Sequence, residues 1–176
     1  MKKGLFIFLI FCFSLTIISC SDDKEESTTD TTPPTVSSTS PSDSDTLVVV
    51  TSTISVTFSE AMDTTSVTTN TSDTSCSGTL QVSSDSFSSC VQMSSSPSAS
   101  NSNKTFTVTP SANLLIYSTF KIKITTGVKN TSGNSLVSAY TTSNGFTTEG
   151  PPNFVAVGSR GTIITSTDGI SWTSRT

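Results

Sequence analysis

The fold is decided by one stretch of the chain, Thr53-Ile54-Ser55-Val56-Thr57-Phe58-Ser59-Glu60-Ala61-Met62-Asp63. Its first half alternates apolar and hydroxyl side chains, which is the two-residue period of a strand with one buried face. Its second half is polar and predicts a corner where the strand ends. We expect Ile54, Val56 and Phe58 to face a core. We expect Glu60 and Asp63 to hydrogen-bond the backbone of the corner, although a carboxylate pair is also a candidate catalytic group.

Further short runs with the same alternation follow at regular spacing. They centre on Leu80 and Val82, Val91 and Met93, Phe106 and Val108, Phe120, Ile122 and Ile124, and finally Phe146. Turn-forming residues separate the runs, and no window has sustained helical periodicity, although residues 111–117 could hold one helical turn. This pattern predicts an all-β fold, an antiparallel sandwich. Lys121, Lys123 and Lys129 are expected on the solvent face of a strand and on the loop after it.

The order of these motifs resembles the bacterial Ig-like domain of the S-layer-protein type. The motifs that carry the resemblance are Pro34-Thr35-Val36 with Ser40-Pro41, Val56 to Asp63, Thr105 to Pro110 with Asn113-Leu114, Gly127 to Asn130 with Gly133-Asn134, and Phe146-Thr147-Thr148. The resemblance covers residues 33–149 and implies an Ig-like antiparallel β-sandwich. The family usually has a tyrosine where Phe120 stands, and whether Tyr117 replaces its hydroxyl is open.

The N-terminus is typical of an export signal. A basic start, Met1-Lys2-Lys3, precedes an apolar run that is shorter than a membrane-spanning helix needs, so residues 1–19 are predicted to be a signal peptide. Ile17-Ile18-Ser19-Cys20 resembles the lipobox of bacterial lipoproteins. The resemblance implies that Cys20 is the lipidated first residue of the mature chain, anchored in membrane lipid. It also implies a place in the cell envelope, with the outer membrane and the cell surface both open. The alternative is an ordinary secreted protein in which Cys20 is incidental.

Composition bounds the remaining classes of protein. Residues 21–32 contain no apolar side chain, so residues 20–32 are predicted to be a flexible tether. The chain has 37 Ser and 34 Thr, and Thr suits the exposed face of strands. Its net charge of -4 argues against a nucleic-acid partner, which requires clustered Lys and Arg. With no His in the chain, a Ser–His–Asp triad and an imidazole metal site are excluded.

Two cysteines remain once Cys12 is assigned to the signal and Cys20 to the lipid. In an exported protein, Cys76 and Cys90 are expected to form a disulfide, and the apolar residues between them suggest a hairpin closed at its base. The alternative is two free thiols. No cofactor is predicted and no metal site is assigned. Asp43 and Asp45 could contribute oxygens to a calcium site, but a solvated turn is the simpler interpretation.

The pattern changes after Glu149. Gly150-Pro151-Pro152 marks a boundary, and residues 154–158 and 161–166 predict a hairpin. The segment Ser166-Thr167-Asp168-Gly169-Ile170-Ser171-Trp172 resembles the Asp-box turn of BNR-type β-propeller repeats, one residue shorter than usual. In such a turn Asp168 accepts backbone N–H bonds, Gly169 supplies a positive φ and Trp172 packs on the sheet. Residues 150–176 are therefore predicted to be a partial propeller-type repeat. Either the chain is truncated relative to its relatives or this segment docks on the Ig-like domain.

Together these features predict a non-enzymatic protein. The first hypothesis is a membrane-anchored lipoprotein whose Ig-like domain is a spacer or a surface-interaction module, with a protein or glycan ligand that the sequence does not identify. The second is a truncated piece of a larger propeller protein with glycan-binding or glycoside-hydrolase function. A sialidase-like site needs an arginine cluster, whereas the chain has only Arg160 and Arg175. A third hypothesis is adhesion to a host or matrix protein.

Overall fold

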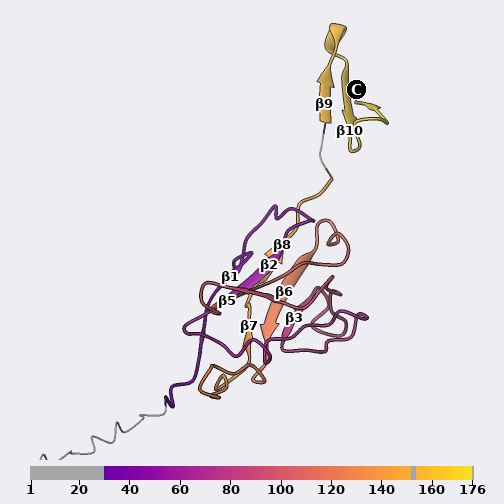
Figure 1. Ribbon diagram of the computed structural model, residues 1–176. Coiled ribbons are helices and arrows are strands. Elements are labelled where there is room, and N and C mark those ends of the chain that lie inside the picture. Colours follow the sequence, from indigo (N-terminus) through magenta and orange to yellow (C-terminus); the bar gives the residue numbers. More distant parts are fainter. Residues whose placement is uncertain (1–29, 152–153, 176) are drawn as a thin grey trace, which may run out of the picture.

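The computed structural model describes residues 30–151 and 154–175 of the chain (Figure 1). The predicted signal peptide, Cys20 and residues 21–29 of the predicted tether lie outside the described residues. The described part is almost entirely β-structure and irregular loops, which confirms the predicted all-β class. Its one helical element is the 3₁₀ turn η1 (Ser159–Gly161). No helix in this part is long and apolar enough to cross a membrane.

Residues 30–149 form a sandwich of two antiparallel sheets (Figure 1). The first sheet has the order β1-β2-β5-β4, from strands β1 (Val36–Ser40), β2 (Ile54–Phe58), β5 (Thr105–Val108) and β4 (Ser98–Ser100). The second has the order β3-β6-β7, from strands β3 (Leu80–Ser83), β6 (Thr119–Ile124) and β7 (Tyr140–Thr141). Strand β8 (Phe146–Thr147) pairs with the start of β6.

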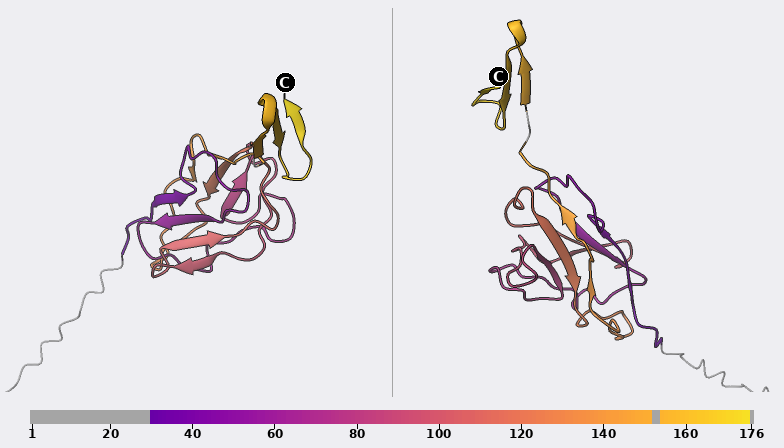
Figure 2. Two further views of the ribbon diagram at one scale, coloured as in Figure 1. Left: turned by 90° about the horizontal axis from the view of Figure 1, so that it is seen from above. Right: turned by 180° about the vertical axis from the view of Figure 1, so that it is seen from behind.

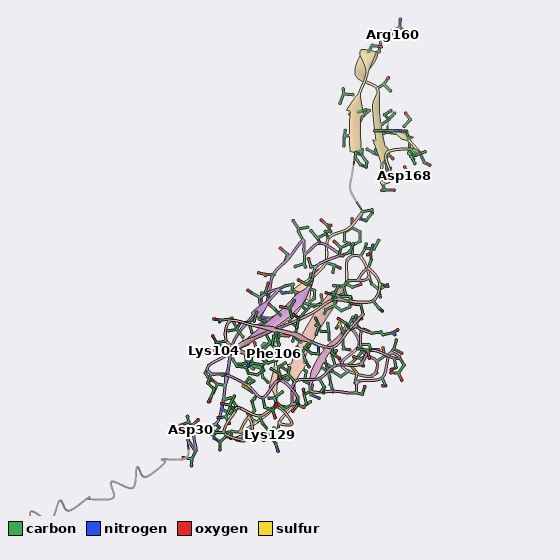
Figure 3. The ribbon with its side chains drawn as sticks, viewed as in Figure 1. Asp30, Lys104, Phe106, Lys129, Arg160 and Asp168 are labelled. Atoms are coloured by element: carbon green, nitrogen blue, oxygen red, sulfur yellow. A yellow bond between two sulfur atoms is a disulfide. The ribbon has the colours of Figure 1, made fainter. Side chains whose placement is uncertain are left out.

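The core lies between the two sheets and has the predicted register. Ile54 pairs with Val108 and Val56 with Phe106 across β2 and β5, and all four side chains are buried. The rings of Phe58 and Phe106 meet edge to face, with their centroids 6.0 Å apart. Across the second sheet, the rings of Phe120 and Phe146 stack at 5.7 Å. Figure 3 shows Phe106 inside the sandwich, where the alternation of its strand places it.

Two details of the predicted strands are wrong. Residues 91–93 form no strand. Met93 is buried, but it makes only a single bridge, to Pro110. The hairpin expected between the two cysteines does not form, since β3 is the one strand between them and its ladder is with β6. Residues 111–117 contain no helical turn. Strands β4 and β7 were not predicted, since β4 is exposed throughout and β7 has only two residues.

Strand β3 is covered on both faces. Leu80 and Val82 face the core, and Gln81 and Ser83 on the opposite face are also buried. The Gln81 amide Nε2 donates to the carbonyl oxygens of Cys76 and Gly78, at 2.9 and 3.0 Å. The loop that leads into and out of β3 therefore folds back over its outer face.

Residues 154–175 form a separate three-stranded sheet, which is drawn apart from the sandwich in the right view of Figure 2. Its strands follow the chain as an antiparallel meander of β9 (Phe154–Val157), β10 (Ile163–Ser166) and β11 (Thr173–Arg175). The predicted hairpin corresponds to β9 and β10, whereas β11 was not predicted. Several large apolar side chains of this sheet are exposed, among them Val155, Val157 and Ile170.

Candidate functional site

The predicted disulfide between Cys76 and Cys90 is present. The two Cα atoms are 5.0 Å apart and the cysteines are 14 residues apart in the sequence. Cys90 is only 3% exposed, and its backbone N–H donates to the carbonyl of Thr74 at 2.7 Å. The bond therefore closes a covalent ring of which β3 is a part, and it fixes the loop that covers the outer face of that strand.

A cavity of about 310 Å³ lies beside this disulfide. The ring supplies one wall, and residues 111–115 supply another. The lining carries hydroxyl, amide and apolar groups but no charged side chain, and includes Cys90, Gln92, Ser111, Asn113, Leu114 and Phe120. None of the carboxylates that the sequence singled out lies in this lining, so the cavity brings together no group suited to acid–base chemistry.

Glu60 and Asp63, the carboxylates of the corner after β2, have different partners. Asp63 Oδ1 accepts the backbone N–H and the hydroxyl of Thr65, at 2.9 and 2.7 Å. The bonds from the Thr65 hydroxyl and N–H lower the pKa of Asp63. Glu60 Oε2 accepts a bond from the side-chain amide of Asn130 at 2.9 Å. Asp63 is thus a turn residue as expected, whereas Glu60 binds a side chain distant in sequence.

Asn130 is the centre of a polar junction that the sequence analysis missed. Its side chain is 1% exposed, and its amide also donates to the carbonyl of Thr32 at 3.1 Å. Its Oδ1 accepts the backbone N–H groups of Ser132 and Asn134, at 3.0 and 2.8 Å. The amide of Asn134 in turn donates to the carbonyl of Asp30 at 2.8 Å. The only signal in the sequence was a polar loop with two asparagines.

The junction holds the chain where it enters the sandwich. Figure 3 shows Asp30 at the end from which the N-terminal segment leaves, on the same side of the sandwich as Lys129. The pKa of Asp30 is lowered, first by the backbone N–H of Thr32 and then by its hydroxyl. The contacts of the domain therefore include Asp30, three residues before the predicted start of the domain.

Asp43 and Asp45 face different partners. Asp43 Oδ1 accepts the backbone N–H groups of Asn144 and Gly145, at 2.9 and 2.6 Å. Asp45 Oδ2 accepts the N–H of Ser42 at 2.7 Å. Among residues 30–151 and 154–175, no three His, Cys, Asp or Glu side chains gather as a metal site would need. The geometry gives both carboxylates hydrogen bonds to backbone N–H groups.

Asp85 is a second group that the sequence did not single out. Its carboxylate accepts the Ser89 hydroxyl at 2.6 Å, the Ser89 N–H at 2.9 Å and the Ser83 hydroxyl at 2.8 Å. These bonds, led by those from Ser89, lower the pKa of Asp85 to about 2. Nearby, Lys123 Nζ lies 5.1 Å from the centre of the Phe87 ring. One of the two lysines expected on the solvent face of β6 therefore also binds the disulfide loop.

The turn after β10 has the geometry expected for Asp168 and Gly169. Asp168 Oδ1 accepts the N–H groups of Ile170 and Ser171, at 2.8 and 2.7 Å. These two bonds hold the pKa of Asp168 well below its usual range. Gly169 has a φ of 72°, and the Phe154 ring lies over it. Trp172 remains 42% exposed. That this turn is an Asp-box stays a prediction.

A family model described as a bacterial Ig-like domain matches residues 30–148. No curated protein matches the chain. Among solved structures, surface layer protein SbsC, domains 1-6, is 17% identical over 81% of this chain and 19% of its own, with a TM-score of 0.48. Native alpha-2-macroglobulin from Escherichia coli is 19% identical over 73% of this chain and 36% of its own, with a TM-score of 0.44.

This chain therefore corresponds to a minor part of each of these solved proteins, 19% and 36% of their lengths. The family model, by contrast, covers the whole sandwich from the Asn130 junction at its entrance to β8 at its end. The chain belongs to the bacterial Ig-like domain family.

Proposed function

We propose that this protein is a lipid-anchored component of the bacterial cell envelope, and that its Ig-like domain is a non-catalytic spacer or surface-interaction module. One observation carries the proposal. A domain of the bacterial Ig-like family begins at residue 30, ten residues after a cysteine whose preceding residues resemble a lipobox. Lipid on Cys20 would place the sandwich close to a membrane, at the end of a short polar segment.

The geometry of the described residues supports the non-catalytic part. The carboxylates with lowered pKa values, Asp30, Asp63, Asp73, Asp85 and Asp168, are each hydrogen-bonded by nearby backbone N–H or hydroxyl groups. A general acid or base at neutral pH needs a pKa near 7, and these pKa values move away from it. They are suited to holding turns.

The test is metabolic labelling with a palmitate analogue in a bacterial host. The wild-type chain should take up label and fractionate with membranes. Cys20→Ala should lose both properties, and globomycin should cause the unprocessed chain to accumulate. Cys12→Ala is the matched control, because it removes a cysteine of the same signal without touching the lipid site. Membrane retention of the Cys20→Ala chain at the wild-type level would refute the anchoring.

A second candidate rests on the C-terminal sheet. Strands β9, β10 and β11 form a meander, as successive strands of a propeller blade do, and the Asp168 turn follows β10. Under this second proposal, the protein is a larger propeller of which this sheet is a part. Determining the coding sequence beyond Thr176 tests it, since further repeats of the Phe154–Gly158 pattern are expected there. A stop codon directly after Thr176 would reject it.

A further inference from the structure

The segment that follows the first strand of the sandwich is bonded directly to the segment that leads out of it. Residues 43–48, which follow β1, lie beside residues 145–149, which lead out of the domain through β8. Four backbone hydrogen bonds link the two segments: Ser44 N–H to Gly145 O at 2.6 Å, Thr147 N–H to Asp45 O at 2.7 Å, Val48 N–H to Thr147 O at 3.1 Å and Glu149 N–H to Val48 O at 2.8 Å. We call this pair of segments the terminal clamp.

The two segments of the terminal clamp run in the same direction where they meet. Val48 and Thr148 form a parallel bridge, unlike the antiparallel ladders of both sheets. The indigo start of the described chain and the orange segment that follows β8 lie at opposite ends of the sandwich (Figures 1 and 2). Tension between the termini therefore pulls residues 43–48 toward one end and residues 145–149 toward the other. The force acts along the two segments, so the hydrogen bonds that join them must break together rather than one after another.

Side chains reinforce this pairing. The Asp43 carboxylate accepts the N–H groups of Asn144 and Gly145, and Asn144 Nδ2 donates to the Ser44 hydroxyl at 3.0 Å. A hydrogen bond to an ionised carboxylate is roughly twice as strong as one between neutral groups. Asp43 therefore adds a charge-assisted link across the terminal clamp at the point where the segments first meet.

The outgoing segment is also bonded on its other side. Thr148 is 2% exposed, and its hydroxyl donates to the carbonyl of Leu115 at 2.6 Å. Its backbone N–H donates to the carbonyl of Ser118 at 3.0 Å, and its hydroxyl accepts the N–H of Ser118 at 3.0 Å. Residues 145–149 thus lie between residues 43–48 and the segment before β6, and cannot peel away alone.

We propose that the terminal clamp gives this domain mechanical stability, so that it resists unfolding when its two termini are pulled apart. The physiological load rests on the proposed function, in which Cys20 fixes one end to a membrane and the domain acts as a spacer or surface-interaction module. The mechanical property itself belongs to residues 43–48 and 145–149, and can be measured without any lipid.

The experiment is single-molecule pulling of the full chain in the Cys20→Ser form, held by peptide tags at its two ends. A second geometry holds the N-terminal tag and an azide-bearing residue introduced at Ser102. That position is in the turn between β4 and β5, at the end of the sandwich where the chain enters, since Met62 N–H donates to Asn103 O and Met62 bridges Asn130. The terminal clamp lies outside this second load path.

The wild-type chain should unfold at a clearly higher force when pulled end to end than in the Ser102 geometry. Asp43→Ala should raise the end-to-end unfolding rate about tenfold at a given force, because forced unfolding is governed by the barrier to unfolding. Asp45→Ala is the matched control. It removes a carboxylate of the same turn that bonds Ser42 and not the outgoing segment, so its effect should stay within about twofold.

Equal forces in the two geometries would overturn the proposal, and this comparison needs no variant. An equal effect of Asp43→Ala in both geometries would also overturn it, since it would mean a general loss of stability. Failure of the palmitate labelling described above would remove the membrane anchor and leave these force measurements unaffected. The two proposals therefore fail separately.

Discussion

The amide of Asn130 donates a hydrogen bond to the carboxylate of Glu60 over 2.9 Å, and so joins two corners that are 70 residues apart in the sequence. The same amide binds the carbonyl of Thr32. One buried side chain therefore fixes the corner after β2, the loop that contains Asn130 itself and the start of the domain.

Asn130→Ala should destabilise the domain by about 2–3 kcal/mol, because it leaves several buried polar groups without partners. Urea unfolding followed by fluorescence measures the change. Asn134→Ala is the control, since its side chain is half-buried and makes one bond to Asp30, so a loss of about 1 kcal/mol or less is expected. Equal losses in the two variants would show that the buried amide is not the centre of the junction.

Gly145→Ala should cost more than Gly133→Ala. Both glycines have a positive φ, 81° and 89°, and an alanine pays about 1–2 kcal/mol for that conformation. A Cβ on Gly145 would also collide with the backbone carbonyl of Phe120, whereas a Cβ on Gly133 meets nothing within 4 Å. The difference between the two melting temperatures isolates the steric part. A Gly145→Ala chain as stable as the Gly133→Ala chain would contradict the close approach of β6 and the outgoing segment.

Replacing both Cys76 and Cys90 with Ser should lower the free energy of unfolding by about 3 kcal/mol, the chain-entropy estimate for a loop of this length. Denaturation of the wild-type chain with and without reductant should give the same difference. Because β3 keeps its pairing with β6, the reduced chain should retain its far-ultraviolet circular dichroism at low denaturant. Identical unfolding curves in the two redox states would argue against a stabilising ring.

Acid should weaken the fold through Asp85. Its pKa is about 2 in the folded chain, below the value of about 3.9 for an unfolded aspartate. A lowered pKa contributes stability above the unfolded value, and this contribution is lost as pH falls through the folded value, so the window is about pH 4 to 2. Asp85→Asn should flatten this part of the stability profile.

A side-chain carboxyl NMR titration of Asp85 tests the cause directly. Ser89→Ala removes the largest interaction and should raise the Asp85 pKa toward its ordinary value. Ser95→Ala, an exposed hydroxyl whose only bond is to the neighbouring Ser96 carbonyl, should leave it unchanged. An Asp85 titration that is the same in wild type and Ser89→Ala would refute the assignment.

The sequence was informative wherever a strand alternates over a buried face. Ile54, Val56 and Phe58, and the matching residues of β5 and β6, are core positions because a two-residue period forces their direction. The disulfide was also predictable, because it joins the two cysteines left after the signal and the lipid site. These features depend on local pattern or on elimination.

Features that depend on distant contacts could not be predicted. Asn130 is buried by Glu60 and Thr32, which arrive from other parts of the chain, and a polar loop gives no sign of this. Gln81 and Ser83 resemble solvent-facing residues of a strand, yet the disulfide loop covers them. Strand β4 carries only Ser and Ala and becomes a strand through its pairing with β5. In each case the partner, rather than the local sequence, determines the outcome.

The covalent ring between Cys76 and Cys90 also limits how long this protein can become. When the rest of the chain is drawn out straight, the ring contributes the 5.0 Å between its two Cα atoms, because the residues between them stay looped out. The 14 Cα-to-Cα steps from Cys76 to Cys90 would span roughly 46–50 Å if they were extended. The reduced chain is therefore longer by roughly 40 Å at full extension. With the lipid anchor proposed above, the redox state of the surroundings would then set the farthest distance from the membrane that the stretched chain can reach.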